Sequence, residues 1–442
     1  MKTLLAIAAM LASVLCDAAT YYVRTDGADT NTGLTDSAGG AWLTIQKAED
    51  TIQPGDTVVV KSGTYSETVT VNTIDGSAGN LRTFRGDGWP VVTKFDVQDA
   101  YTRIEGFSVQ STNTDGVAIH LKAGSSFSQI ISNWIETRGS GVEVHSSAAI
   151  EGYSIIGNTF TNLPKAMLLY AKAGAVGQVI ASNLVVRLSQ RGLTSYDCDS
   201  VRLLGGPNWT IARNVFLGGA TNDIDTTAGV PHVDAVQHFN ESGQPSVTNV
   251  VVVRNFALGH HTFIQVTGTN HGWWTISSNV VGRGLDNVVS GSTNGVALVN
   301  MDTAQGTVVF TRNTAVDQET AAVFYNCPDV AVRENVFWNV GTAYSFTGST
   351  PGTGTTNITY SSSSPDAGTG DSAADPLLVN PWDPLGADGL PWTNDDGCAL
   401  QSGSPARDMA FDGSDIGAYQ YATPTGMTWV ITNLTVGSIT AP

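Results

Sequence analysis

The stretches SIIGNTF at residues 154–160 and VIASNLV at residues 179–185 decide the fold of this chain. In each, apolar residues and one small residue precede an asparagine. The same pattern recurs along the chain, and its asparagines are Asn133, Asn158, Asn183, Asn214, Asn255, Asn279, Asn313 and Asn335. These asparagines lie 25, 25, 31, 41, 24, 34 and 22 residues apart. The shortest intervals indicate a repeat of roughly 22 to 25 residues, and the longer intervals indicate the same repeat with an inserted loop.

A repeat of this length with short strands rich in Val and Ile predicts an all-β fold, a right-handed parallel β-helix. Each coil would contribute about three strands, stacked roughly 4.8 Å above those of the previous coil. An asparagine at the same corner of every coil can donate to one neighbouring coil and accept from the other, which pairs turn backbone that is otherwise buried without a partner. We therefore interpret the asparagines as a structural ladder.

The composition is compatible with one solenoid and excludes some partners. A chain of 442 residues usually divides into several domains, but a solenoid grows by stacking and needs no such division. The net charge of -18 argues against a nucleic-acid partner. It also means that a polyanionic substrate would need local cations to offset the overall repulsion.

The N-terminal residues indicate export. Lys2 precedes an apolar run from Leu4 to Leu15 and then small residues, so residues 1–19 are predicted to be a signal peptide. The run is shorter than the roughly 20 residues of a membrane-spanning helix, and no later stretch is long enough. We expect a secreted protein, extracellular or periplasmic, without a membrane span and monomeric. Removal of residues 1–19 would also remove Cys16. The mature chain would then keep Cys198, Cys327 and Cys398, which allow at most one disulfide.

The sequence divides the mature chain into three parts. Residues 20–348 are predicted to form the β-helix, with an N-terminal cap at 20–65 in which a short amphipathic helix at 42–52 covers the open end of the stack. Residues 349–374 are rich in Ser, Thr and Gly and are predicted to be a loop or linker. Residues 375–442 are expected to form the closing segment of the β-helix.

Both ends of the mature chain resemble a known group of proteins. The segments that carry the resemblance are YYV at 21–23, WLTIQKA at 42–48, PGDTV at 54–58, DPLL at 375–378, SGSPA at 402–406 and DIGAY at 415–419. They are similar to the opening and closing segments of secreted, pectin-lyase-like right-handed parallel β-helix proteins. That superfamily includes polysaccharide lyases, glycoside hydrolases, epimerases and non-catalytic surface proteins. The resemblance therefore implies the fold, and implies a carbohydrate partner only as an expectation.

A second strand in each coil, about eight residues after the asparagine, contains the main candidate for a site. If its side chains alternate between core and solvent, the fourth column faces outward. That column reads His120, His145, Tyr170, Tyr196 and His238. It would form a stripe of about 20 Å, long enough for several sugar rings, whose His and Tyr side chains can transfer protons near neutral pH. The alternative is a stabilising stack of cross-strand contacts.

Loop insertions after Asn183 and Asn214 contain paired carboxylates. The pairs are Asp197 with Asp199 and Asp223 with Asp225. Carboxylates two residues apart can share one hard cation, so these four residues are a candidate Ca²⁺ site. The alternative is that they are turn-forming residues, which are common in glycine-rich loops.

The favoured hypothesis is a polysaccharide lyase that cleaves a uronic-acid-containing glycan by β-elimination. This chemistry needs a base, an acid and a cation that stabilises the enediolate. The predicted catalytic residues are His145, Tyr170, Tyr196, Asp234 and His238. The predicted substrate-binding residues are His120, Glu143, Lys165, Arg191, His232, Gln237, His260 and His261.

Two alternatives remain open. A glycoside hydrolase needs two carboxyl groups that flank the scissile bond, and Asp234 can fill this role together with Asp197, Asp199 or Glu143. A non-catalytic solenoid would use the same stripe to bind sugar without cleaving it. The lyase is preferred because His and Tyr dominate the predicted stripe.

Overall fold

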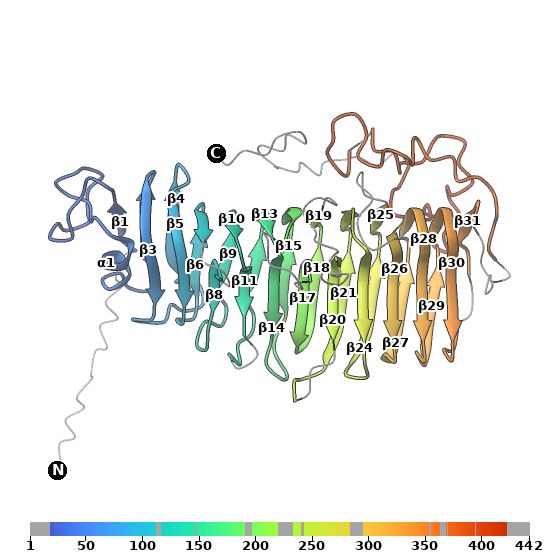
Figure 1. Cartoon of the computed structure of the whole chain (residues 1–442), viewed down its shortest axis with the longest axis horizontal. Coiled ribbons are helices and arrows are strands. Elements are labelled where there is room, and N and C mark those ends of the chain that lie inside the picture. Colours follow the sequence, from blue (N-terminus) through green and yellow to red (C-terminus); the bar gives the residue numbers. More distant parts are fainter. Residues whose placement is uncertain are drawn as a thin grey trace, which may run out of the picture.

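The protein is an elongated solenoid of parallel strands (Figure 1). The computed structural model describes residues 18–111, 116–145, 148–190, 197–219, 233–239, 243–282, 295–352, 355–362, 368, 370–393 and 395–421. Within them the regular structure is almost entirely strand. This confirms the predicted parallel β-helix.

One face of the solenoid is a 12-stranded sheet, sheet A. Its strands, in spatial order, are β1 (Thr20–Val23), β2 (Thr57–Lys61), β4 (Arg82–Asp87), β6 (Thr102–Glu105), β9 (Gln129–Ile131), β12 (Ser154–Ile156), β15 (Gln178–Ala181), β18 (Pro207–Ala212), β21 (Val247–Val253), β24 (His271–Ser277), β27 (Gln305–Thr311) and β29 (Asp329–Arg333). Every neighbouring pair is parallel, so each strand is one coil further along the axis.

The remaining strands form a 19-stranded sheet that bends into two faces. Face 2 contains β7 (Ser108–Ser111), β10 (Trp134–Thr137), β13 (Thr159–Leu163), β16 (Leu184–Leu188), β19 (Val215–Leu217), β22 (Phe256–Leu258), β25 (Val280–Gly282) and β31 (Ile358–Tyr360). Face 3 contains β8 (Ile119–Leu121), β11 (Ser140–Val144), β14 (Lys165–Tyr170), β17 (Asp199–Gly205), β20 (Asp234–Phe239), β23 (Thr262–Thr267) and β26 (Gly295–Asp302). The strands β3 (Thr64–Val71), β5 (Val91–Val97), β28 (Thr314–Tyr325) and β30 (Val336–Thr347) complete the sheet, and β5, β28 and β30 pair with both faces or run through both.

The three faces enclose one continuous apolar core. Inward positions of face 3 are occupied, coil after coil, by Ile119, Val142, Met167, Val201, Val236 and Ile264, all fully buried. The strands are short and each pairs with the coil on either side, so stacking fixes the register wherever an apolar column must face inward.

The predicted asparagine ladder is confirmed. From Asn158 onward, the Oδ1 atom of each ladder asparagine accepts from the backbone N and the Nδ2 of the asparagine one coil earlier, at 2.8–3.1 Å. The Oδ1 of the first, Asn133, accepts from the backbone N of Phe107 at 3.0 Å. Each Nδ2 also donates to a backbone carbonyl, for example from Asn214 to Ile180 at 3.0 Å. The ladder extends one coil beyond the prediction to Asn357, whose backbone N and Nδ2 donate to Asp371.

The helix expected at 42–52 is shorter in the structure. Helix α1 (Ile45–Glu49) lies beside β1 at the N-terminal end of the solenoid (Figure 1). The side chain of Thr44 caps its N-terminus by accepting from the backbone of Lys47 at 3.1 Å. Beyond Glu49 the chain forms a turn that leads into β2.

A buried ion network joins α1 to the first coils. The Arg82 guanidinium is fully buried and lies 3.1 Å from the Glu49 carboxylate and 2.8 Å from that of Asp99. It also donates to the backbone carbonyl of Glu49 at 2.7 Å. Because both carboxylates and the guanidinium have partners, the network can be buried without an isolated charge.

The C-terminal segment lies alongside the last coils (Figure 1). Its apolar side chains Leu378, Leu400 and Ile416 form a second core with face 2 residues that include Val280 and Val336. The backbone N of residue 417 also donates to the carbonyl of residue 334 at 2.8 Å. The segment therefore packs against the side of the solenoid.

Cys198, Cys327 and Cys398 are all buried and unpaired in the structure. The predicted upper limit of one disulfide is compatible with this finding. In the part of the chain that the structure describes, no helix is long and apolar enough to cross a membrane.

Candidate functional site

The predicted stripe of His and Tyr side chains does not form, because the strand register differs from the expected alignment. Strands β8 and β11 pair so that His120 lies beside Glu143, not beside His145. Strands β17 and β20 pair so that His238 lies beside Leu203. A shift of one residue moves a side chain to the other surface of a sheet, so His238 faces the core.

The environment of His238 is that of a core residue. It is 1% exposed, and its Nδ1 lies 2.9 Å from the carbonyl oxygen of Leu203. Its ring centroid lies 5.9 Å from that of His271. Burial lowers the pKa of His238 to about 4, so the imidazole is neutral at pH 7. It does not face solvent, which corrects its predicted position on the exterior.

The other stripe residues are dispersed. Tyr170 is 7% exposed and packs into the core, whereas His145 is exposed at the end of β11. His120 is half-buried, with its Nδ1 3.8 Å from Asp96, and burial lowers the pKa of its imidazole. Tyr196, Arg191, His232, Asp223 and Asp225 lie outside the described residues.

A different set of predicted residues does come together, at the start of the face 3 strands. Lys165 of β14 pairs with Asp199 of β17, and Asp234 of β20 pairs with Thr262 of β23. Because Val201 pairs with Val236, the same register places Asp199 beside Asp234. We call Lys165, Asp199, Asp234 and Thr262 the acid column.

The two carboxyl groups of the acid column are fully buried. Asp199 and Asp234 are each 0% exposed. Burial raises the pKa of Asp199 well above its usual range, and the neighbouring charge of Asp234 raises it further. Burial likewise raises the pKa of Asp234, to about 7. Two carboxyl groups on adjacent strands in a dry environment cannot both ionise easily, so the pair retains a proton near neutral pH.

Hydrogen bonds distinguish the two members of the pair. The side chain of Gln237 donates to Oδ2 of Asp234 at 2.9 Å, and this bond favours the charged form of Asp234. Both carboxyl oxygens of Asp199 are buried without a hydrogen-bond partner. An unpartnered buried carboxylate is costly, so the proton of the pair resides mainly on Asp199.

The rim of the acid column carries opposite charges. The Arg202 guanidinium lies 3.9 Å from the carboxylate of Asp197 and 5.5 Å from the ring centroid of Phe239. The side chains of Arg202 and Asp197 are 20% and 34% exposed. Solvent therefore reaches this rim although the carboxyl pair itself is covered.

Polar side chains continue from the rim along the outer surface of face 3. One column contains, coil after coil, Asp96, His120, Glu143, Leu168, Arg202, Gln237, Gln265 and Asn300. Within it, the side-chain amide of Asn300 donates to Gln265 at 3.1 Å. The sequence analysis identified three of these residues, His120, Glu143 and Gln237, as substrate-binding, but it did not identify Gln265 or Asn300 as residues of a site. Only the pairing register of the strands places these residues in the column, and the sequence alone did not reveal that register.

His260 contacts the residue that follows Asp199 in β17. Its Nε2 lies 3.2 Å from the hydroxyl of Ser200, and its Nδ1 lies 2.9 Å from the carbonyl oxygen of Leu258. Burial lowers the pKa of His260 to about 4. The neighbouring His261 is held by its backbone N, which donates to the carbonyl of Val233 at 2.7 Å. His260 therefore contacts the start of β17, which carries Asp199, and His261 contacts the residue before β20, which carries Asp234.

The predicted calcium site includes two residues that the structure describes and two that it does not. Asp197 and Asp199 lie at the acid column, whereas Asp223 and Asp225 are outside the described residues. Among the described residues, no group of three or more His, Cys, Asp or Glu side chains is arranged to hold a metal ion. Calcium binding thus stays a prediction.

No protein-family model matches the sequence, and no curated protein matches it. Solved structures do share the fold. One is pectate lyase Pel9A, with a TM-score of 0.50 and 14% identity over 91% of this chain and 96% of that one. Another is XylC in complex with xylose, with a TM-score of 0.52 and 9% identity over 72% and 75% of the two chains. A rhamnogalacturonan lyase matches with a TM-score of 0.45 and 13% identity over 87% and 97%. At these identities the likeness establishes the parallel β-helix alone.

Proposed function

We propose that this protein is a glycan-cleaving enzyme and that Asp199 and Asp234 form its proton-transfer pair, as in a glycoside hydrolase. The supporting observation is the buried carboxyl pair itself, in which one member is stabilised as an anion and the other is not. Carbohydrate as the substrate class agrees with the neighbouring structures, among them pectate lyase Pel9A and XylC with xylose.

The two residues receive different roles. Asp199 carries the shared proton and donates it to the glycosidic oxygen as that bond breaks. Asp234, which accepts a hydrogen bond from Gln237, is ionised and attacks the anomeric carbon. Water then displaces Asp234 while Asp199, now ionised, removes the proton from that water. The adjacent-strand spacing of about 4.8 Å is close to the roughly 5 Å carboxyl separation of retaining enzymes, so we expect retention of configuration.

Substrate must reach a pair that is covered. Asp199 and Asp234 are fully buried and, by strand alternation, lie on the core side of their strands with Val201 and Val236, so substrate would enter at the partly exposed rim formed by Asp197 and Arg202. Once the substrate is bound, exclusion of water keeps the pKa of Asp199 high until proton transfer occurs.

A second candidate, β-elimination on a uronic-acid glycan, is favoured by one specific observation. Lys165 and Arg202 are cations close enough to lower the pKa of Asp199. They can neutralise a substrate carboxylate, and Lys165 can act as the base. Of the His and Tyr residues predicted to be catalytic, His238 faces the core and Tyr170 is buried, so these two do not support this mechanism.

The two chemistries differ in their products. The protein is incubated with neutral and uronic-acid polysaccharides while reducing ends and absorbance near 235 nm are recorded. Hydrolysis releases reducing ends without absorbance, and NMR of the early product reports the anomeric configuration. A parallel rise in absorbance would establish elimination instead. No product from any polysaccharide, at any pH from 4 to 9, would contradict both mechanisms.

A further inference from the structure

A second polar and aromatic surface lies at the corner of the solenoid formed by the N-terminal ends of the sheet A strands from β4 to β24. Strand pairing aligns one residue per coil along this corner. The aligned residues are Leu81, Tyr101, Phe127, Gly152, Gly177, Asn208, Asn249 and Trp273. We call them the sheet A corner. Asp199 begins β17 whereas Asn208 follows its end, so the corner and the acid column lie at opposite ends of that strand.

The backbone is left-handed at six of the eight positions of this corner, all except Leu81 and Gly177. Gly152, Asn208 and Asn249 have φ of 67°, 67° and 54°, a conformation that Gly and Asn adopt readily. Tyr101 and Phe127 have φ of 54° and 61° at the same position, and Trp273 has 52°. A bulky residue costs about 1 kcal/mol or more in this conformation. The corner therefore carries aromatic side chains where its backbone favours glycine or asparagine.

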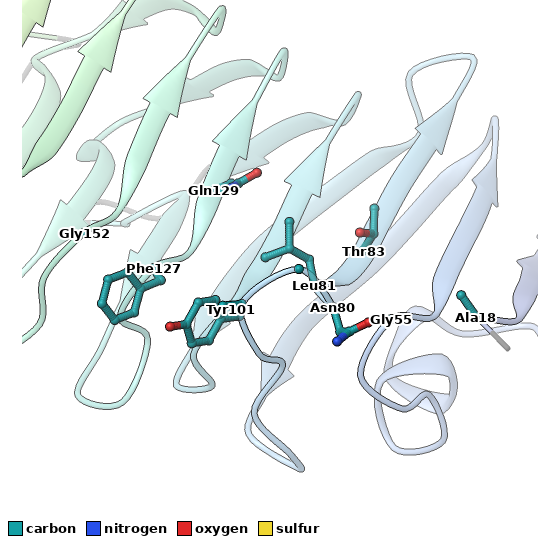
Figure 2. Close-up of a pocket in the computed structure, with 11 residues that line it drawn as sticks. Ala18, Gly55, Asn80, Leu81, Thr83, Tyr101, Phe127, Gln129 and Gly152 are labelled. Carbon is teal, nitrogen blue, oxygen red and sulfur yellow. The ribbon is translucent and has the colours of Figure 1, made fainter. Parts of the chain in front are cut away.

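The two adjacent aromatic side chains form one platform. The rings of Tyr101 and Phe127 lie nearly parallel, with centroids 4.9 Å apart and an interplanar angle of 13° (Figure 2). Gly152 makes room for the platform, because a Cβ atom there would lie 2.4 Å from Cδ1 of Phe127. Replacing this glycine by any other residue would displace the ring.

The platform belongs to a groove of about 580 Å³, within the usual range for a ligand site. Hydrogen-bonding side chains of Asn80, Thr83 and Gln129 line it beside the rings (Figure 2). None of the described residues that line it has a carboxylate, ammonium or guanidinium group. Such a mixture of ring surface, amide and hydroxyl groups matches a pyranose, which has apolar C–H faces and hydroxyl edges.

Polar and aromatic groups extend the surface along the axis. The side chain of Asn249 is exposed and donates to that of Asn208, which is half-buried, at 2.6 Å. Trp273, one coil further, is 54% exposed. Tyr101 and Trp273 are six coils apart, which corresponds to roughly 30 Å at the usual strand spacing. This length accommodates several consecutive sugar residues.

We propose that the sheet A corner is a binding surface for an uncharged polysaccharide, separate from the acid column. The uncharged groove and the net charge of -18 disfavour polyanions, so the occupant is a neutral glycan chain that lies along the axis. Tyr101 and Phe127 hold one end of the bound segment, the Asn208 and Asn249 amides bind hydroxyl groups in the middle, and Trp273 holds the other end.

Affinity electrophoresis with soluble xylan, mixed-linkage β-glucan and galactomannan tests the proposal, with polygalacturonate and alginate as anionic comparisons. The informative variant is Y101G/F127G. Glycine removes both rings and also relieves the left-handed backbone, so loss of binding is not a consequence of added strain. We expect the affinity for at least one neutral polysaccharide to fall by about tenfold or more. The single variant Trp273→Gly, at a mostly exposed ring, should reduce affinity less.

Matched controls separate this surface from the rest of the protein. Trp382→Ala and Phe411→Ala remove exposed aromatic rings from the C-terminal segment and should leave binding unchanged. Asp199→Asn should also leave it unchanged, whether or not the enzyme is active. Unaltered binding by Y101G/F127G and Trp273→Gly, preference for the anionic polymers, or no binding to any neutral polysaccharide would each overturn the proposal.

Discussion

The asparagine ladder and the acid column are both lines of buried polar residues that run along the solenoid, one residue per coil, yet they differ in hydrogen bonding. In the ladder, the Oδ1 of Asn214 accepts two hydrogen bonds and its Nδ2 donates two. In the acid column, neither carboxyl oxygen of Asp199 has a partner. In the ladder, protein groups satisfy the hydrogen bonds of the side-chain amide, whereas in the acid column the carboxyl oxygens of Asp199 have none.

This difference separates a structural role from a functional one. Buried polar groups are normally paired, and an unpaired one costs about 1 to 3 kcal/mol. The ladder follows that rule in every coil from Asn133 to Asn357. Asp199 does not, and a buried side chain whose carboxyl oxygens have no hydrogen-bond partner is a candidate for chemistry. The predictions below test this contrast.

The largest expected effect is on activity. Asp199→Asn and Asp234→Asn should each lower kcat/KM by about 10³-fold or more, because each removes a proton-transfer group while preserving its shape. Initial rates of reducing-end release provide the measurement. Asp96→Asn is the matched control, since Asp96 also lies on face 3 but is paired with Lys94 and Lys122 at 2.9 Å. Near-normal activity of Asp199→Asn would remove the acid column from the mechanism.

A ladder substitution should instead affect stability. Asn214→Ala leaves the backbone N and Nδ2 of Asn183, the carbonyl of Ile180 and part of Asn255 without partners, so we expect the free energy of unfolding to fall by about 3 to 5 kcal/mol. Denaturant titration measures this change.

Asn72→Ala, at an exposed position, is the control for the ladder and should change stability by less than about 0.5 kcal/mol. If Asn214→Ala were as stable as this control, the ladder would not be the structural element that its hydrogen bonds indicate.

The pH dependence of stability should have opposite signs in the two buried ionisable sites. The folded pKa of Asp234 is raised to about 7, so its contribution is fully present below about pH 4 and is lost as the pH rises through 7. The folded pKa of His238 is lowered to about 4, so its contribution is present above about pH 6.5 and is lost as the pH falls through 4.

Two variants isolate these contributions. Between pH 4 and pH 8, the free energy of unfolding of Asp234→Asn should rise by about 2 to 4 kcal/mol relative to that of the unaltered protein. As the pH falls from about 6.5 to 4, the free energy of unfolding of His238→Gln should fall by about 2 to 3 kcal/mol less than that of the unaltered protein. Unfolding free energies from denaturant titrations across this pH range provide the test. Parallel pH profiles for all three proteins would contradict the assigned pKa shifts.

The smallest expected effect is that of Gln237→Ala. Loss of its hydrogen bond to Asp234 removes a contact that favours the anion, so the pKa of Asp234 should rise further. We expect activity to fall by about tenfold and the ascending limb of the pH-rate profile to move to higher pH by up to about one unit. A uniform loss of rate without any shift would indicate that Gln237 orients Asp234 without affecting its ionisation.

The sequence supported the fold more strongly than the site. Asn133 to Asn335 recur at intervals close to one coil, and this local pattern needs no knowledge of strand pairing. The predicted stripe depended on aligning His120, His145 and His238 across coils of unequal length. Insertions and short turns displaced that alignment by one or two residues, which was enough to place His238 in the core.

The candidate site was recovered in part. Asp234 was predicted to be catalytic and Gln237 to bind substrate, and Asp199 was predicted either as a calcium ligand or as a carboxylate that acts with Asp234 in a hydrolase. Their assembly beside Lys165 depended on pairing between β14, β17 and β20, whose residues are separated by loops in the sequence. Gln265 and Asn300 escaped prediction because only the paired strands place them in line with Arg202.

By itself, then, the sequence determined the coil repeat and the asparagine ladder, because both follow from local periodicity and from the need to pair buried backbone. Only the tertiary structure decided which side chains of different coils meet, because a one-residue change in strand register reverses the direction of a side chain. The pKa values of Asp199 and Asp234 likewise arise only when folding places two carboxyl groups side by side and removes both from water.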